Sequence, residues 1–458
     1  MEDMKNGKRS SFSGKLGYVL AAAGASVGLG NIWRFPYLAA KYGGGIFLII
    51  YIVLALTFGY TMIVAETAIG RMTRKSPVGA FKSFGKKKWL SFGGWINAVI
   101  PVLIVPYYSV IGGWVIKYLV EYFRGNAKLL AEDGYFTDFI SNGVSTELCF
   151  VAFCAFTLII IFAGVQNGIE RVSKIMMPIL IVLSVIIAVY SVTRPGAFAG
   201  VKYFLVPNVK NFSWMTVVAA MGQMFYSLSI AMGILITFGS YMKKDTAIED
   251  STRNVEIFDT GIAIMAGLMI IPAVFAFSGG DPDTLQAGPS LMFITIPKVF
   301  QNMGFGTVIG IVFFLLVLFA AVTSSIALTE SAVSTFEDEL GWGRKKATVL
   351  VGVIMLALGS LSSLGYGPLA GIKIIGMQFL DLFDFLTNSV MMPIAALLTS
   401  LFVSRVVGIN KIEEEIIHGE SAFRRKKVFV VMIKYLCPVF AIIILLSSVA
   451  NALGWIKM

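Results

Sequence analysis

Charged residues are scarce in this sequence. They make up 14% of its 458 residues, while 57% of the residues are hydrophobic, and a soluble protein carries about 25% charged residues. A chain with so few charges cannot cover its surface as a soluble domain does, so we expect a protein that crosses a membrane many times. A short cleavable signal is also lacking before the first apolar run, and we expect the polar, basic segment 1–15 to be retained on the cytoplasmic side.

Residues that bind metals or carry redox chemistry are almost missing. The single histidine, His418, lies in a charged loop, and Cys149, Cys154 and Cys437 lie in apolar runs without paired spacing. This composition argues against a zinc centre, a redox centre and a disulfide framework. No constellation of nucleophile and base stands out, so we do not expect an enzyme.

Long apolar runs dominate the sequence instead. A membrane-spanning helix needs about 20 residues, and eleven runs reach about that length: 16–38, 44–70, 90–123, 147–165, 174–193, 212–241, 255–278, 304–335, 347–366, 374–403 and 429–453. The expected fold class is therefore an all-α polytopic membrane protein with about 11 transmembrane helices. An odd number of spans places the two termini on opposite sides of the membrane.

The net charge of +11 comes mainly from the loops between these runs. Most of the 37 lysines and arginines fall in the N-terminal segment and in every second loop after it, such as 71–88 and 344–346. This alternation follows the positive-inside rule and favours a cytoplasmic N-terminus and an external C-terminus. It explains the charge without a nucleic-acid partner, and we expect none.

Two of the apolar runs contain residues that a continuous membrane helix should avoid. The first holds three glycines between positions 24 and 30, followed by Asn31 and Arg34, and the second is interrupted by the sequence SLSIAMG at 227–233. Glycine costs about 1 kcal/mol in a helix relative to alanine, and charged groups are expensive in hydrocarbon. A helix opens at such a place when its freed backbone lines a cavity. Two interrupted segments in corresponding positions indicate a transporter binding site.

The breaks divide the chain into comparable units. Residues 16–193 hold spans one to five and residues 212–403 hold spans six to ten, and each unit opens with a broken span. Because each unit has an odd number of spans, the second unit is inverted relative to the first. This predicts a 5+5 inverted repeat with discontinuous helices 1 and 6, followed by helix 11 at 429–453.

Four stretches carry a family resemblance: 24–36 (GASVGLGNIWRFP), Tyr107-Tyr108, 223–233 and 323–325. They resemble the neurotransmitter:sodium symporter family, in its bacterial hydrophobic amino-acid transporter branch, and the resemblance covers nearly the whole chain. It implies the LeuT-type fold, with an L-amino acid substrate, sodium ions and the lipid bilayer as partners. We expect a monomer or weak dimer in the plasma membrane of a bacterium.

The resemblance implies two sodium ions. Na⁺ is a hard cation that prefers oxygen ligands. The first ion would be held by the Ser26 carbonyl, Asn31, Ser227 and Asp259, and the second by the carbonyls of Gly24, Val27 and Ala320 with the hydroxyls of Thr323 and Ser324. Taken alone, these two hydroxyls favour a structural role, in bonding to the preceding turn or joining neighbouring helices.

Asp259 and Ala263 depart from the family pattern. Most members carry Asn at the position of Asp259, and the animal members that need chloride have a small polar residue where this chain has Ala263. An acid buried beside sodium can supply the negative charge itself, so we expect transport to be independent of chloride. The alternative role for Asp259 is an ion pair near the cytoplasmic end of its span.

The resemblance also places the substrate. Its carboxylate would meet the N–H groups of Leu29 and Gly30 and the hydroxyl of Tyr108, since a half-helix N-terminus attracts anions. The full set of residues around the substrate is Ala25, Ser26, Leu29, Gly30, Ile104, Tyr108, Tyr226, Ser227, Ser229, Met232, Ser324 and Leu328. None of these side chains is charged, which favours hydrophobic substrates. The alternative for Tyr107-Tyr108 is an interfacial aromatic pair.

Charged residues match the gates of the family. Arg34 and Asp384 correspond to the outer pair, and Arg9 and Asp338 to the inner pair, for which a solvated ion pair is the alternative. Phe12 stands at the inner gate where the family usually has Trp. Two further acids within spans, Glu66 and Glu330, are expected to form structural hydrogen bonds.

The sequence therefore predicts a sodium-coupled symporter that imports hydrophobic or aromatic L-amino acids, such as leucine, phenylalanine or tryptophan, by alternating access. A sodium-coupled carrier of another small amino acid or of an amine is the alternative within transport. An ion channel is the alternative from another class, although a channel would need a continuous polar pore.

Overall fold

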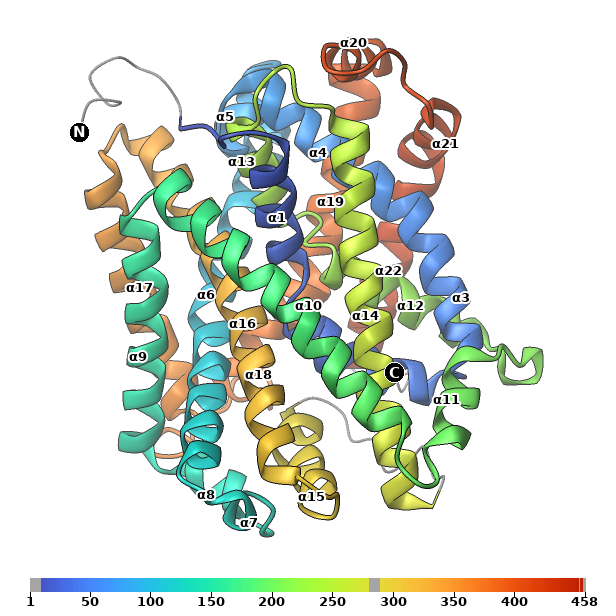
Figure 1. The fold of residues 1–458 in the computed structure, drawn as a ribbon. Coiled ribbons are helices and arrows are strands. Elements are labelled where there is room, and N and C mark those ends of the chain that lie inside the picture. Colours follow the sequence, from blue (N-terminus) through green and yellow to red (C-terminus); the bar gives the residue numbers. More distant parts are fainter. Residues whose placement is uncertain (1–9, 280–288, 453, 456–458) are drawn as a thin grey trace.

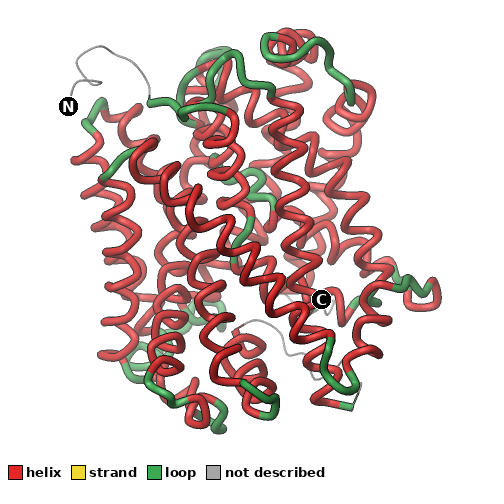
Figure 2. Tube along the Cα trace, in the orientation of Figure 1, coloured by secondary structure: helices red, strands yellow, loops and turns green. Residues whose placement is uncertain are grey.

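The computed structural model describes residues 10–279, 289–452 and 454–455. Within these residues every regular element is a helix, and Figure 2 shows helices joined by short loops without a strand. In hydrocarbon, every backbone polar group needs a partner, and a helix provides these partners within one segment. The expected all-α membrane fold is confirmed.

Nine helical segments among the described residues are long and apolar enough to cross a membrane. They are α3–η3–α4 (Gly45–Thr73), α6 (Lys88–Phe123), α9 (Gly143–Phe162), η4–α10 (Val165–Val192), α14 (Ile248–Ser278), α16 (Gly306–Leu340), α17 (Arg344–Leu364), α18–η8–α19–η9 (Phe379–Val407) and α21–η10–α22 (Lys426–Asn451). Shorter elements connect them: α5 (Pro77–Lys82), α7 (Ala127–Leu130), α8 (Tyr135–Ser141), α11 (Ala197–Leu205), η5 (Val209–Asn211), η7 (Leu291–Thr295), α15 (Ile296–Gln301) and α20 (Ile409–Ile417).

The two remaining apolar runs are interrupted, as the sequence predicts. The first consists of α1 (Lys15–Ser26) and a second part, η2 (Gly30–Arg34) with α2 (Phe35–Lys41), and the two parts meet at 53°. The second consists of α12 (Trp214–Ser227) and α13 (Ile234–Tyr241). Within the described residues, length and composition alone support nine spans, or ten with the bent pair. The count of eleven and the repeat boundaries stay predictions.

The interrupted helix α1 lies in the middle of the bundle. It packs against α14, α16 and α10, and α10 crosses obliquely over α14 and α16 (Figure 1). Its residues from Gly17 to Ser26 are all buried. A helix that faces protein on every side can open without exposing its backbone to lipid, which is the condition for a break at membrane depth.

Helices α4 and α13 approach each other closely enough for their backbones to touch. A β-carbon at Gly70 would collide with the carbonyl oxygen of Ile236, and one at Gly239 would collide with the carbonyl oxygen of Thr67. Small residues permit such close packing between membrane helices. This contact holds the second half of the broken α12–α13 segment against a continuous span.

We expect Gly239→Ala to destabilise the protein, because the added methyl group must push α13 away from α4. Overpacking of this kind costs about 1–3 kcal/mol. The matched control is Gly261→Ala in α14, where a β-carbon meets nothing within 4 Å. Thermal unfolding of the purified variants in detergent checks this: a lower melting temperature is expected for Gly239→Ala alone, and equal melting temperatures would contradict the backbone contact.

Candidate functional site

A cavity lies where the two broken helices face each other. Its free volume is about 30 Å³, and it is lined by Ala25, Ser26, Gly28, Leu29, Gly30, Asn31, Ile104, Tyr108, Tyr226, Ser227, Ser229, Met232, Ser324 and Leu328. The walls come from the two breaks, α6 and α16. Every residue that the sequence analysis placed around the substrate lines this cavity, together with Gly28 and Asn31.

The first break presents main-chain groups to the cavity because its glycines leave room for other helices. A β-carbon at Gly28 would lie 2.7 Å from the Ser324 hydroxyl oxygen and 3.1 Å from the Tyr108 hydroxyl oxygen, and one at Gly30 would enter the ring of Tyr226. The Leu29 N–H donates to the Tyr108 hydroxyl at 3.3 Å. The free helix end and the phenol therefore share one corner of the cavity, where an anionic group has donors to bind.

The second break depends on an unusual backbone. Ser229 and Ala231 have left-handed conformations, with φ values of 53° and 59°, which non-glycine residues rarely adopt. Two hydrogen bonds hold this geometry: the Ala231 N–H donates to a carboxylate oxygen of Glu66 at 2.8 Å, and the Ser229 hydroxyl donates to the Ala25 carbonyl at 2.9 Å. Glu66, expected to form a structural hydrogen bond, therefore ties α4 to the opened chain.

Asp259 of α14 forms the centre of the predicted first sodium site. This fully buried acid accepts hydrogen bonds from the Asn31 amide at 2.8 Å, the Ser227 hydroxyl at 2.8 Å and the Tyr51 hydroxyl at 2.9 Å. The Tyr51 hydroxyl also lies 3.1 Å from that of Ser227. A buried carboxylate is costly unless it is paired and hydrogen-bonded, and here both breaks and one neighbouring span supply its donors.

The predicted second sodium site lies between α1 and α16. The Ser324 hydroxyl is 3.2 Å from the Gly24 carbonyl oxygen and 3.4 Å from that of Val27. The Thr323 hydroxyl donates within its own helix, to the carbonyls of Phe319 at 2.9 Å and Ala320 at 3.2 Å. Ser324 thus joins α1 to α16, while Thr323 bonds to the preceding turn of α16. Each of the two hydroxyl oxygens lies beside main-chain carbonyl oxygens.

The oxygen atoms available as ligands at the two predicted sodium sites suit a hard monovalent cation. Carbonyl, hydroxyl and amide oxygens predominate, with Asp259 as the one carboxylate. Within the part of the chain that the structure describes, no group of three or more His, Cys, Asp or Glu side chains could hold a transition metal. Hard cations take oxygen ligands, whereas zinc and iron favour nitrogen and sulfur.

The outer side of the cavity is covered by Tyr226 and charged neighbours. The Arg34 guanidinium lies 5.3 Å from the centre of the Tyr226 ring. Asp384 accepts hydrogen bonds from the Tyr107 hydroxyl at 3.2 Å and from the Asn388 amide at 2.5 Å. Arg34 and Asp384 interact electrostatically, but among the described residues no ion pair within 4 Å joins them. Tyr107 therefore bonds to the outer acid, while Tyr108 faces the cavity.

The inner side is closed by aromatic packing. Phe12 is buried, donates its backbone N–H to the Tyr241 carbonyl at 3.0 Å, and packs edge-on against Tyr18, Phe238 and Tyr241. The Phe12 side chain therefore fills the position at which the family usually has the larger tryptophan. Arg9, the predicted partner of Asp338, lies outside the described residues, and Asp338 accepts the Ser76 N–H at 2.6 Å.

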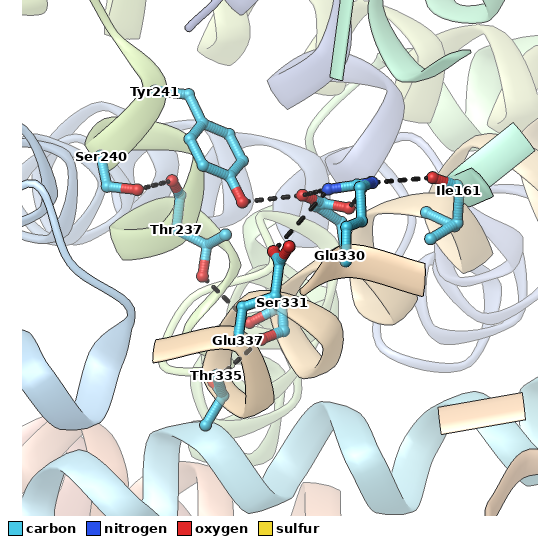
Figure 3. Close-up of polar contacts among 9 residues, drawn as sticks. Ile161, Thr237, Ser240, Tyr241, Glu330, Ser331, Thr335 and Glu337 are labelled. Atoms are coloured by element: carbon cyan, nitrogen blue, oxygen red, sulfur yellow. Dashed lines mark hydrogen bonds and ion pairs between the residues drawn. The ribbon is translucent and has the colours of Figure 1, made fainter. Parts of the chain in front are cut away.

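A second buried acid organises the same side. Glu330 accepts the Tyr241 hydroxyl at 2.7 Å and pairs with Arg344, whose guanidinium also donates to the Ile161 carbonyl at 3.0 Å (Figure 3). These contacts join α9, α13, α16 and α17. The structural hydrogen bonding expected of Glu330 is present, and an arginine that the sequence analysis assigned only to a loop completes it.

Two site residues escaped the sequence analysis as individuals. Tyr51 lies in a run of apolar residues in which a tyrosine gives no signal of function, and only its contact with Asp259 reveals its role. Gln223 donates its amide to the Gly30 carbonyl at 3.0 Å. Its signal was an uncharged amide within an apolar run, just before the second break.

A cavity between two interrupted membrane helices, with main-chain and hydroxyl oxygens around it, is the arrangement of secondary transporters. The sequence comparison specifies the class further. Residues 9–137 and 134–455 match the profile of the "Sodium:neurotransmitter symporter family". The chain belongs to this family, and it is a transporter rather than an enzyme.

Named relatives agree with this assignment. An uncharacterised sodium-dependent transporter of Bacillus subtilis is 34% identical, over 97% of this chain and 99% of its own. The sodium- and chloride-dependent GABA transporter 2 of Macaca fascicularis is 26% identical, over 89% of this chain and 74% of its own. The crystal structure of MhsT in complex with L-phenylalanine superposes with a TM-score of 0.86 at 35% identity, covering 96% of this chain and 100% of that one. The expected family and the LeuT-type fold are confirmed.

Tyr51→Phe should weaken sodium binding without altering the shape of the cavity, because it removes one donor from Asp259. A hydrogen bond to a charged group contributes about 1.5–3 kcal/mol, so at least about a tenfold higher sodium concentration should be needed for half-maximal stabilisation against heat. Tyr118→Phe is the matched control, since that buried hydroxyl bonds to the Phe293 carbonyl at 2.7 Å. Identical sodium titrations of the two variants would remove Tyr51 from the site.

Proposed function

We propose that this protein is a sodium-coupled symporter that imports hydrophobic and aromatic L-amino acids by alternating access. The observation that supports it best is the composition of the cavity. One corner offers main-chain N–H groups and a phenol, the rest is apolar or weakly polar, and no charged side chain lines it. Binding of L-phenylalanine by MhsT, a 35% identical protein, supports the same substrate class.

The zwitterionic part of the substrate would bind at the breaks. Its carboxylate would accept hydrogen bonds from the N–H groups of Leu29 and Gly30 and from the Tyr108 hydroxyl, at the positive end of a half-helix. Its ammonium would donate to the carbonyls of Ala25, Tyr226 and Ser227. The carboxylate and the ammonium are common to every amino acid. Their contacts therefore contribute affinity but do not distinguish one substrate side chain from another.

The side chain would then be selected by the opposite wall. Ile104, Met232 and Leu328 are apolar there, and Ala25 and Ser229 are small. A charged side chain would lose its hydration and find no partner, which costs several kcal/mol. Met232 can adapt its three rotatable bonds to different shapes, so both aliphatic and aromatic substrates fit the proposal.

Two sodium ions would couple transport to the ion gradient. The first would use Ser26, Asn31, Ser227 and Asp259, and the second Gly24, Val27, Ala320, Thr323 and Ser324. Both sets include backbone from a broken helix, so sodium binding would order the segments that also bind the substrate. Each charge that enters adds about 2.3 kcal/mol per 100 mV of membrane potential.

Alternating access would come from contacts that can break and reform. Outside, Arg34, Asp384 and the aromatic cover of Tyr226 would close over the substrate. Inside, the contacts of Phe12 and Tyr241, and the predicted pair of Arg9 with Asp338, would open to release it. The protein would work in the plasma membrane, with the N-terminus in the cytoplasm and the C-terminus outside, as a monomer or weak dimer.

A carrier of another small amino acid or an amine remains the second candidate. The likeness to a GABA transporter favours it, whereas the apolar wall at Ile104, Met232 and Leu328 favours larger hydrophobic substrates. A channel would require a polar path through the protein, and the aromatic contacts on the two sides of the cavity argue against one.

Uptake into proteoliposomes tests the proposal. Labelled leucine or tryptophan should enter saturably with a sodium gradient, fail to enter when potassium replaces sodium, and be displaced best by hydrophobic amino acids. Thr323→Ala should raise the sodium concentration for half-maximal uptake several-fold, while Thr329→Ala, which removes a buried hydroxyl bonded within the same helix, should not. Best displacement by small polar amino acids or amines would favour the second candidate, and sodium current without substrate would favour a channel.

Transport should not require chloride, because Asp259 would carry the compensating charge. Replacing chloride with gluconate should leave uptake by the parent protein within twofold, whereas Asp259→Asn should reduce uptake at least tenfold in gluconate. Asp381→Asn, at an exposed acid of α18, provides the matched control and should be unaffected. Loss of uptake by the parent protein in gluconate would refute chloride independence.

A further inference from the structure

A groove on an exposed face of α17 shares no residue with the cavity between the broken helices. It is lined by Trp342, Lys345, Lys346, Val349, Leu350 and Val353, and we name it the α17 groove. Val349 and Val353 have 56% and 58% of their surface exposed. They lie one turn apart on the same face, so the groove continues along the helix as an apolar stripe.

The depth of the groove in the membrane follows from the length of α17. The helix has 21 residues, which corresponds to about 31 Å at 1.5 Å per residue, close to the thickness of the hydrocarbon core. Its first turn therefore lies at the membrane surface, and Val349 and Val353 lie in the region of the acyl chains. Trp342, just before the helix, is of the type enriched at this boundary.

The surface end of the groove is positively charged. Lys345 and Lys346 are exposed there, and the Lys346 ammonium lies 5.3 Å from the centre of the Trp342 ring. The nearby acids are engaged elsewhere. Glu330 and Glu337, both labelled in Figure 3, form ion pairs with Arg344, and Glu339 pairs with Lys82 at 2.6 Å. The two lysines therefore remain available to an anion from the membrane surface.

We propose that the α17 groove binds an anionic phospholipid. The phosphate lies between Lys345 and Lys346, and one acyl chain follows Val349, Leu350 and Val353. Basic residues at the surface attract anionic lipids, and the apolar stripe matches a hydrocarbon chain. A soluble anion or a hydrophilic peptide has no apolar part that would bury against this stripe. The lysines belong to a loop of the strongly basic side, which is predicted to be cytoplasmic, so the lipid comes from that leaflet.

Native mass spectrometry of the purified full-length protein tests the site. The protein is equilibrated with equal amounts of phosphatidylglycerol and phosphatidylcholine and then stripped of loosely bound lipid. The parent protein should retain one phosphatidylglycerol in preference to phosphatidylcholine. In the double variant Lys345→Gln/Lys346→Gln, the ratio of retained phosphatidylglycerol to retained phosphatidylcholine should fall about tenfold, because each basic residue near the surface contributes to the preference.

Two further variants separate the groove from general charge. Lys86→Gln/Lys87→Gln removes two exposed lysines of another basic loop and should retain the lipid as the parent does. Val353→Trp keeps both lysines but fills the apolar stripe, and it should also lose the retained lipid. Equal retention of the two lipids by the parent, equal losses in the two lysine pairs, unchanged binding in Val353→Trp, or displacement of the lipid by inorganic phosphate would each overturn the proposal.

Discussion

The structure depends on how two stretches of opened backbone are satisfied within a membrane. Hydrocarbon offers no hydrogen bonds, so each freed N–H or carbonyl must find a partner inside the protein or a ligand. Surrounding helices provide many of these partners: Gln223 bonds to the Gly30 carbonyl, Ser324 to the carbonyls of α1, and Glu66 to the Ala231 N–H. Residues of both breaks also line the cavity. The same constraint that makes the breaks costly thus makes them a binding site.

Asp259 concentrates this logic in one residue. Its three donors come from the first break, the second break and the neighbouring span, so the acid connects the elements that move relative to one another in an alternating-access transporter. A buried carboxylate with neutral donors keeps a net negative charge in its surroundings. Such a place attracts a cation more strongly than neutral oxygen ligands alone would, since Coulomb interactions strengthen in a low dielectric.

The two sides of the cavity are held by different kinds of contact. Outside, Arg34 stacks on Tyr226 without a direct ion pair to Asp384 among the described residues. Inside, the ion pair of Arg344 with Glu330 joins four helices, and Phe12 is wedged among aromatic rings. Separating a buried ion pair is costly, because each charge is then left buried without its partner. Among the described residues, the side that carries Glu330 is therefore held by a buried ion pair, whereas Arg34 and Asp384 form no such pair.

The sequence by itself determined the all-α membrane fold and the two breaks, and the family resemblance of its motifs predicted most of the cavity wall. Membrane helices must be long and apolar, and glycines or polar groups at 24–34 and 227–233 violate that rule so strongly that a local pattern is enough to detect them. Only the tertiary structure decided that Tyr51 bonds to Asp259 and that Glu66 bonds to the Ala231 N–H. It also decided that Glu330 pairs with Arg344. These contacts join positions on different helices, and helix packing, not local periodicity, sets which side chains meet.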